Sequence, residues 1–558
     1  MTEVPPPGAV PTPSAAVPAA PGDGVRARAS AATVWNFFRH GRGRIALPGL
    51  VGMVLLVFGG LGSGALREHD PLLESLHLSW LRYGHGEIVA GTLVWIGVLL
   101  VIASWVRLGR AARAGEVSLR QMSWVVPLWT VPLLVSVPLF SRDAYSYLAQ
   151  GALLRDGFDP YGVGPVVNPG VLLDNVSTVW TTTTAPYGPG FLILGRLITM
   201  FTGDNVVFGT MMLRIFMLPG LALMVWAIPR ITRHLGGDPT IALWLGVLNP
   251  LVLVHLIGGV HNEVLMVGLM CAGILLVLRR RHLWGIVLIA LAVSVKATAG
   301  AALPFMVWIW MIHRREDAHL AGADEPVFWR SFLRTAGLGA LTFVAVFAAV
   351  SAAAGVGLGW MTALQGSNKI INWLSLPTLV AQLYTVATGW LTGVPLAPVL
   401  AVTRMISAVA LVTIVVVVVL RYRHSVRQAM LGVLWTMMAI VLLSPAALPW
   451  YYSWPLAVAA GFALSSTTLA WLVGLSVWMM LIFKPDGGIG LYQVQYLVLA
   501  TVVALIAAKS LTAVDPLQVR RRLGMRPVGA DTETAARQTP DSSTDEDPAA
   551  PAERGTPR

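Results

Sequence analysis

The chain has 558 residues, of which 56% are apolar and 12% are charged, and its mean hydropathy is +0.70. Soluble globular domains carry about 25% charged residues, so this composition excludes an ordinary soluble enzyme and indicates a membrane protein. The net charge of +12 does not indicate a nucleic-acid partner, because the cations lie in short loops between apolar stretches.

Residues 1–44 are predicted to form a disordered cytoplasmic tail. Their first part, MTEVPPPGAVPTPSAAVPAAPGDG, is rich in proline, alanine and glycine. No apolar core follows a charged N-terminal region, so the pattern is not that of a signal peptide. Residues 511–558 are predicted to form a second, mostly disordered cytoplasmic tail.

Residues 45–510 are predicted to form one all-α bundle of transmembrane helices. A helix needs about 20 mostly apolar residues to span a bilayer. Candidate spans lie at 45–65, 87–106, 122–140, 206–229, 239–260, 263–279, 283–299, 300–313, 334–355, 396–420, 427–447, 451–466, 467–484 and 491–509. Because several are short, this criterion predicts about 11 to 14 transmembrane helices.

The arginines determine the predicted orientation of the bundle. With the N-terminus inside, the inner connections collect the arginine clusters at 279–281, 314–315 and 520–522, whereas the outer connections hold few cations. Cytoplasmic loops of membrane proteins carry an excess of lysine and arginine. We therefore predict a multi-pass protein of the plasma membrane with both termini in the cytoplasm.

Two segments, 141–204 and 356–395, are too rich in proline, glycine and polar residues to span the membrane. The first contains STVWTTTTAPYGPG and the second contains QGSNKIINW. Both fall on the outer side in the predicted orientation and are expected to be extracytoplasmic loops. Their apolar parts, GFLILGRLITMF and LPTLVAQLYTVATGW, would suit helices that lie along the membrane surface.

Polar and aromatic residues from distant parts of the chain meet at this predicted outer face. They come from the loop that begins SRDAYSY, from the YGPG run, from the hairpin GGVHNE and from the run PWYYSW. The candidate site residues among them are Arg142, Asp143, Tyr145, Tyr187, His261, Asn262, Glu263, Trp450 and Tyr451.

Each of these groups also has a purely structural interpretation. Asp143 could form a surface ion pair or cap the next helix. Residues 261–263 could cap a tight helical hairpin, and Trp450 and Tyr451 could belong to the aromatic belt at the membrane surface. The sequence leaves these alternatives open.

Three cations, Arg214, Lys296 and Arg404, fall in the outer halves of apolar spans. A charge in hydrocarbon costs about 2.5–3.5 kcal/mol on insertion scales, so such residues usually face a cavity or an anionic partner. Without matching acids inside the membrane, they indicate a bound anion, for which a lipid phosphate is the natural candidate. The alternative is that each side chain extends to the headgroups.

In their order along the chain, these motifs resemble the GT-C membrane glycosyltransferases. More narrowly, they resemble the actinobacterial polyprenol-phosphomannose-dependent α-1,6-mannopyranosyltransferases that build the lipomannan backbone, the MptA/MptB type. The resemblance rests on SRDAYSYLAQGALLRDGFDPYGVGP, YGPG at 187–190, GGVHNE and PWYYSW, and it covers roughly residues 45–510. The long proline-rich N-terminal tail is more similar to the MptB type.

The resemblance implies a polyprenyl-phosphate mannose donor and a lipid-anchored mannan acceptor of the lipomannan and lipoarabinomannan type. It also implies an acidic catalytic residue in an early outer loop, and the matching position is Asp143. In many GT-C enzymes this acid follows the first helix, where the present chain has Glu68 and Asp70. These two therefore remain rivals to Asp143.

Transfer from a β-linked donor to an α-linked product implies a single inverting displacement with one general base. Asp143 would be this base, and Lys296, with Arg214 or Arg404, would stabilise the departing phosphate. The remaining candidates would orient the substrates, or stack on the sugar rings together with Trp180.

The lipid-linked sugar is a substrate, and no cofactor is predicted. The single cysteine, Cys271, lies in an apolar run, which excludes a disulfide framework and a cysteine-based metal site, although the metal requirement stays open. Membrane lipids are the other expected partners, and no protein partner is indicated. The alternative function is a secondary transporter or flippase of a lipid-linked glycan, which would place charges at the membrane midplane and break helices there.

Overall fold

The computed structural model describes residues 31–68, 70–324, 327–513 and 515–518. These ranges form helices and loops and contain no β-strand beyond two isolated bridges, which confirms the all-α class. Most of both predicted tails, including the arginines at 520–522, lies outside the described residues. Part of the first predicted tail is helical and forms α1 (Ala31–His40). Phe37 of this helix is buried and packs against Phe38 and Trp124.

Seven helices of the described chain are long and apolar enough to cross a membrane. They are η1–α2 (Arg42–Ser63), α4 (His85–Arg113), α10 (Val206–Leu235), α16 (Phe328–Ala354), α19 (Leu396–Arg421), α20 (Val426–Leu443) and α23 (Val494–Thr512). The halves α11 (Pro239–Gly246) and α12–η4 (Pro250–Gly258) form an eighth if they are counted as one span bent by 42°. The chain is thus a multi-pass membrane protein.

This number is lower than the predicted 11 to 14 because several predicted spans are short helices. Apolar helices of 14 to 16 residues form α9 (Pro189–Thr202), α13 (Glu263–Leu278), α14 (His282–Val295) and α22 (Ser466–Leu481). A helix of 14 residues is about 21 Å long. It is therefore shorter than the hydrocarbon core, which is about 30 Å thick.

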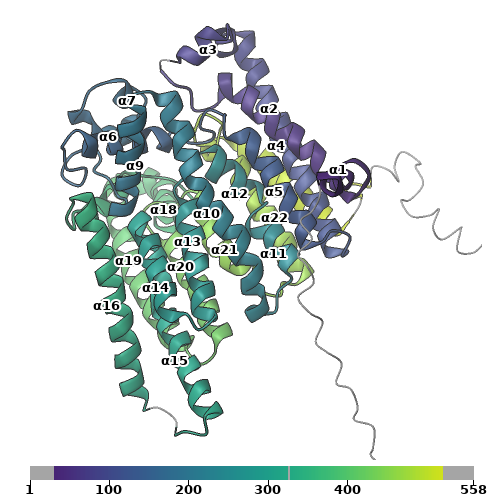
Figure 1. The fold of residues 1–558 in the computed structure, drawn as a ribbon. Helices are drawn as coiled ribbons and strands as arrows, with labels where there is room; N and C mark the ends of the chain where they lie inside the picture. The colour runs from purple at the N-terminus through teal and green to yellow at the C-terminus, as the bar shows by residue number, and fades with distance from the viewer. Residues whose placement is uncertain (1–30, 69, 325–326, 514, 519–558) are drawn as a thin grey trace, which may run out of the picture.

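The segment 141–204 folds into short helices at one end of the bundle. Figure 1 shows α6 (Asp143–Arg155) and α7 (Val171–Asp174) there, beside α3 (Pro71–Ser75). The C-terminal end of α15 (Leu303–Leu320) and the N-terminal end of α16 lie at the opposite end. The predicted outer and inner segments are thus at opposite ends, and the side of the membrane that each faces stays a prediction from the arginines.

The two predicted surface helices are helical in the structure. GFLILGRLITMF lies within α9, and LPTLVAQLYTVATGW lies within α18 (Leu376–Thr392). Their depth in the membrane remains a prediction.

Glycines allow helices to cross closely near the end of the bundle that holds α6. Where α6 crosses α9, a Cβ atom on Gly151 would lie 2.4 Å from the carbonyl carbon of Gly195. Where α10 crosses α13, a Cβ atom on Gly268 would lie 2.2 Å from the carbonyl oxygen of Gly220. Inside a membrane, small residues let helix backbones approach this closely.

A third glycine crossing brings two charged residues together. In the pair α13–α14, a Cβ atom on Gly273 would lie 2.7 Å from the carbonyl oxygen of Gly285. Helix α13 begins at Glu263, and Lys296 directly follows α14. Because the two helices are antiparallel neighbours, these side chains meet and form an ion pair.

We expect Gly151→Ala to destabilise the protein by about 1–3 kcal/mol, because the added methyl group has no space at the α6–α9 crossing. Gly337→Ala on α16 is the matched control, since a Cβ atom there meets no atom within 4 Å. Thermal unfolding of both variants in detergent would measure the difference. Equal melting temperatures would contradict this account of the crossing.

Candidate active site

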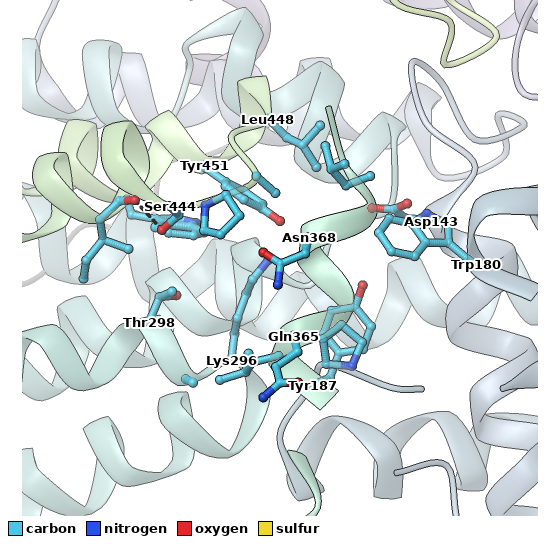
Figure 2. Close-up of a pocket in the computed structure, with 18 residues that line it drawn as sticks. Asp143, Trp180, Tyr187, Lys296, Thr298, Gln365, Asn368, Ser444, Leu448 and Tyr451 are labelled. Carbon is cyan, nitrogen blue, oxygen red and sulfur yellow. Dashed lines mark hydrogen bonds between the residues drawn. The ribbon is translucent and has the colours of Figure 1, made fainter. Parts of the chain in front are cut away.

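A cavity of about 520 Å³ opens beside the first turn of α6. Its other walls come from the connection before α9, from the chain after α14, from η6 (Leu364–Lys369) and from the end of α20 with the turn η7 (Pro449–Tyr452). Its polar and aromatic lining includes Asp143, Trp180, Tyr187, Lys296, Asn368 and Tyr451. In Figure 2, Asp143 and Trp180 lie on one side of the cavity and Ser444 lies on the opposite side.

Asp143 is the first residue of α6, and its side chain is 15% exposed. Its backbone N–H donates to the Ser141 hydroxyl at 3.1 Å. Burial and, to a smaller extent, the carboxylate of Glu263 together raise the pKa of the Asp143 carboxyl to about 7, against the opposing effect of Lys296. The group therefore titrates near neutral pH, as a general base should.

The structural interpretations of Asp143 do not fit this geometry. The N-cap of α6 is Arg142, and no side chain caps the helix. The Arg142 guanidinium donates to the backbone carbonyls of Leu66 and Asn175, at 2.9 Å and 3.0 Å, and does not pair with Asp143. The Asp143 carboxylate lies close to His261 instead, whose Nδ1 is 3.6 Å from its Oδ2.

Lys296 reaches the cavity and forms an ion pair with Oε1 of Glu263. Its Nζ lies 4.3 Å from the centre of the Tyr451 ring and 5.3 Å from that of Trp454. Aromatic faces attract a cation, so these rings stabilise the ammonium group in its half-buried position. An ammonium has three donors, so the pair with Glu263 leaves donors for another acceptor in the cavity.

The hairpin residues His261 and Asn262 directly precede Glu263 in the chain, and both are fully buried. The His261 ring stacks on Trp450, with centroids 3.8 Å apart and an angle of 20° between the planes. Asn262 occupies the N-cap of α13, but its side chain does not cap the helix. Trp450 is only 4% exposed, so it belongs to the packed site and not to an aromatic belt at the membrane surface.

Arg404 contacts the cavity wall from outside. Its guanidinium donates to the carbonyls of Asn368 and Ile370 at 2.8 Å and 2.7 Å. Both of these residues line the cavity, whereas Arg404 does not. The structure therefore places Arg404 as a positioning residue of the wall, where the sequence analysis predicted a phosphate ligand.

Arg214 and Tyr145 do not line the cavity, in contrast to their predicted roles. Arg214 is 1% exposed and donates to the carbonyls of Ile257 and Gly258, at 3.1 Å and 3.0 Å, where the π-helical turn η4 ends. Tyr145 is equally buried, and its hydroxyl donates to the carbonyl of Ala65 at 2.5 Å. The Arg214 guanidinium and the Tyr145 hydroxyl thus donate to backbone carbonyls, whereas both residues were predicted to bind a substrate.

The rival acids also lie outside the cavity lining. Asp70 is buried and pairs with Arg67 and Arg82 at 3.0 Å and 2.8 Å. Its other oxygen accepts from the backbone N–H of Leu73 and so caps α3. Glu68 is exposed to solvent. Among the residues that line the cavity, Asp143 is the acidic one.

Several polar lining residues were not predicted individually. Gln365 and Asn368 come from η6, Thr298 follows Lys296, and Ser444 ends α20. The polar run QGSNKIINW was the available signal for the first two, because polar residues are unusual in so apolar a chain. Within the described ranges, no group of three or more histidine, cysteine, aspartate or glutamate side chains could hold a metal ion.

Comparison with known proteins places the chain in a family. Residues 46–312 match the model described as alpha-(1->6)-mannopyranosyltransferase, N-terminal domain, and residues 377–513 match the MptB C-terminal domain. Alpha-(1->6)-mannopyranosyltransferase A of Mycobacterium tuberculosis is 53% identical over 474 residues, which cover 85% of this chain and 91% of that protein. No solved structure matches the chain.

Two Corynebacterium glutamicum proteins help to place the chain within the family. Alpha-(1->6)-mannopyranosyltransferase A is 39% identical over 81% of this chain and 95% of its own length, and alpha-(1->6)-mannopyranosyltransferase B is 30% identical over 75% and 73%. The higher identities to the A proteins do not support the preference for a B type that the N-terminal tail suggested. The chain belongs to the α-(1→6)-mannopyranosyltransferase family and is a membrane glycosyltransferase.

Proposed function

We propose that this protein transfers mannose from a polyprenyl-phosphate mannose to a growing lipid-anchored α-1,6-mannan, with Asp143 as the general base. The names of the relatives support the sugar and the linkage. The observation that supports the assignment to this site is the Asp143 carboxylate, which lines the cavity and whose pKa of about 7 suits proton transfer at neutral pH.

In the proposed reaction, the oxygen of the acceptor's 6-hydroxyl attacks C1 of the donor mannose, and Asp143 accepts the proton of this hydroxyl. The bond from C1 to the phosphate oxygen breaks, and the polyprenyl phosphate leaves from the opposite face with inversion. The Lys296 ammonium donates to the departing phosphate, which gathers negative charge in the transition state. Tyr187 and Tyr451 offer ring faces to the sugars at the cavity wall.

The predicted orientation places this site on the extracytoplasmic side of the plasma membrane. The donor's polyprenyl chain would then lie in the bilayer beside the apolar part of the lining, which includes Leu364, Ile440 and Leu448. A lipid-linked donor is consistent with a cavity at one end of a transmembrane bundle.

We expect transfer activity to rise with pH through neutrality. The Asp143 carboxyl is protonated below its pKa of about 7 and cannot then accept a proton. The value of kcat/KM should therefore increase about tenfold per pH unit below 7 and reach a plateau above it. A profile that is flat from pH 5 to 8 would mean that Asp143 has an ordinary pKa or is not the base.

The function can be tested in membranes that contain the protein, a radiolabelled polyprenyl-phosphate mannose and a synthetic α-1,6-mannoside. We expect the label to appear in longer mannosides and to be absent from membranes without the protein. The bent pair α11 and α12–η4 is a feature that transporters share. Label that crosses the bilayer in the unchanged donor would support the transporter and contradict the proposal.

A further inference from the structure

Asp143 lies in the wall between two cavities. The second cavity has a volume of about 300 Å³, and it shares Asp143, Trp180, Ile370 and Leu448 with the first. It extends to the other side of the α6 N-terminus, where Ser141, Arg142 and Trp450 line it. The proposed base can therefore be reached from two separate spaces, as a reaction between two large substrates requires.

A third cavity of about 390 Å³ lies next to the second. The two share Arg142 and Asp486, and the third is further lined by Glu87, Trp95, Lys484 and Tyr496. The three cavities are thus linked in sequence by common wall residues, with Asp143 between the first and the second.

A tight turn at 484–488 separates the second cavity from the third. The N–H of Gly487 donates to the carbonyl of Lys484 at 2.9 Å, and the N–H of Lys484 donates to the carbonyl of Gly488 at 2.8 Å. Gly487 has a φ of +94°, which suits the glycine that follows a Pro-Asp turn pair. The Asp486 carboxylate accepts from the N–H of Gly488 at 2.8 Å and closes the turn.

This turn is attached directly to the segment that carries the proposed base. The carbonyl of Pro485 accepts from the N–H of Phe140 at 2.8 Å, and a Cβ atom on Gly487 would lie 3.3 Å from Cα of Ser141. Lys484 and Asp486 are therefore held at a fixed place relative to Asp143. Lys484 also lies 5.7 Å from the centre of the Tyr496 ring.

The chemistry of the third cavity fits a neutral polyhydroxylated ligand. Two cations, Arg142 and Lys484, line it together with two acids, Asp486 and Glu87. Sugar hydroxyls both donate and accept hydrogen bonds, so they can use both signs of charge, whereas for a phosphate the two carboxylates offset the attraction of the two cations. The rings of Trp95 and Tyr496 add apolar faces of the kind that pack on a sugar ring.

We propose that the second and third cavities hold the sugar chain of the acceptor, and that Lys484 and Asp486 determine how strongly the enzyme prefers longer acceptors. The inference rests on the proposed mannose transfer. The terminal sugar lies in the second cavity with its 6-hydroxyl at Asp143, and the preceding sugars extend past Arg142 into the third. The donor occupies the first cavity, which contains Lys296.

The test compares transfer to synthetic α-1,6-mannosides of two and of four or more residues that carry the same aglycone. In Lys484→Met, the ratio of kcat/KM for the long acceptor to that for the short one should fall about tenfold, the effect expected for loss of a hydrogen bond to a charged group. Asp486→Asn should lower the ratio in the same direction, and its amide oxygen can still accept from Gly488.

Lys509→Met is the matched control. It removes a lysine from the last turn of α23, about 20 Å along that helix from Tyr496, and it should keep the wild-type ratio. An unchanged ratio in both Lys484→Met and Asp486→Asn, with wild-type transfer intact, would overturn this inference and leave the proposed function standing. Wild-type protein that transfers to no acceptor would instead contradict the proposed function.

Two other outcomes would also overturn the inference. A penalty that depends on the acceptor's lipid and not on its number of sugars would assign the third cavity to a lipid headgroup. Folded variants that fail on short and long acceptors alike would place the turn in the reaction centre and not in an extended acceptor site.

Discussion

Asp143→Asn should lower kcat for mannose transfer by about a hundredfold to ten-thousandfold, which is the usual contribution of a general base. Asparagine has nearly the same shape as aspartate but cannot accept the proton of the acceptor hydroxyl. The variant should fold and insert normally, because Asp143 contributes no cap to α6 and its charged form is disfavoured by burial and by Glu263. Single-turnover transfer in membranes with equal amounts of protein would measure the loss.

Asp70→Asn is the control for this experiment. It weakens two buried ion pairs, to Arg67 and Arg82, and should therefore lower the melting temperature in detergent. The folded fraction of that variant should still transfer mannose. Wild-type turnover by Asp143→Asn together with loss of turnover in folded Asp70→Asn would reverse the assignment of the base.

Lys296→Met should both destabilise the protein, by about 3–5 kcal/mol, and abolish transfer. The substitution leaves the buried Glu263 carboxylate without its cationic partner, and it removes the ammonium proposed to stabilise the departing phosphate. Unfolding in detergent would report the first effect and the transfer assay the second.

The double variant Lys296→Met/Glu263→Gln separates these two effects. Both members of the pair are then neutral, so most of the lost stability should return. Transfer should stay low, because neither replacement supplies a cation. Recovery of transfer with stability would show that Lys296 acts only as the partner of Glu263.

The sequence was most informative where charge and burial conflict. Lys296 stands out as a charged residue in an apolar span, Asp143 and Glu263 were candidates from the outer connections, and the structure brings the three together. The same reasoning failed for Arg214, because a buried cation needs acceptors but the sequence does not say whether a ligand or the backbone supplies them. The acceptors are carbonyls at the end of a π-helical turn, which hydrophobic periodicity does not reveal.

Loop residues were the least predictable part of the site. The turn at 484–488 lies beside Ser141, more than three hundred positions earlier in the chain. A backbone hydrogen bond from Phe140 joins the two segments, and such a bond leaves no signal in the local sequence. Arg404 was expected from the sequence to bind a phosphate, whereas its guanidinium donates to the carbonyls of Asn368 and Ile370. Its contact with the wall at 368–370 depends on tertiary packing and could not be read from the sequence.

The position of Asp143 between two cavities also determines how water competes with the acceptor. With the donor bound and the smaller cavity free of acceptor, a water molecule there stands where the attacking hydroxyl would stand. In the proposed mechanism the same carboxylate would activate this water molecule, and the product would be free mannose. Hydrolysis of the donor should therefore be slow but measurable without acceptor, and an acceptor that fills the smaller cavity should suppress it.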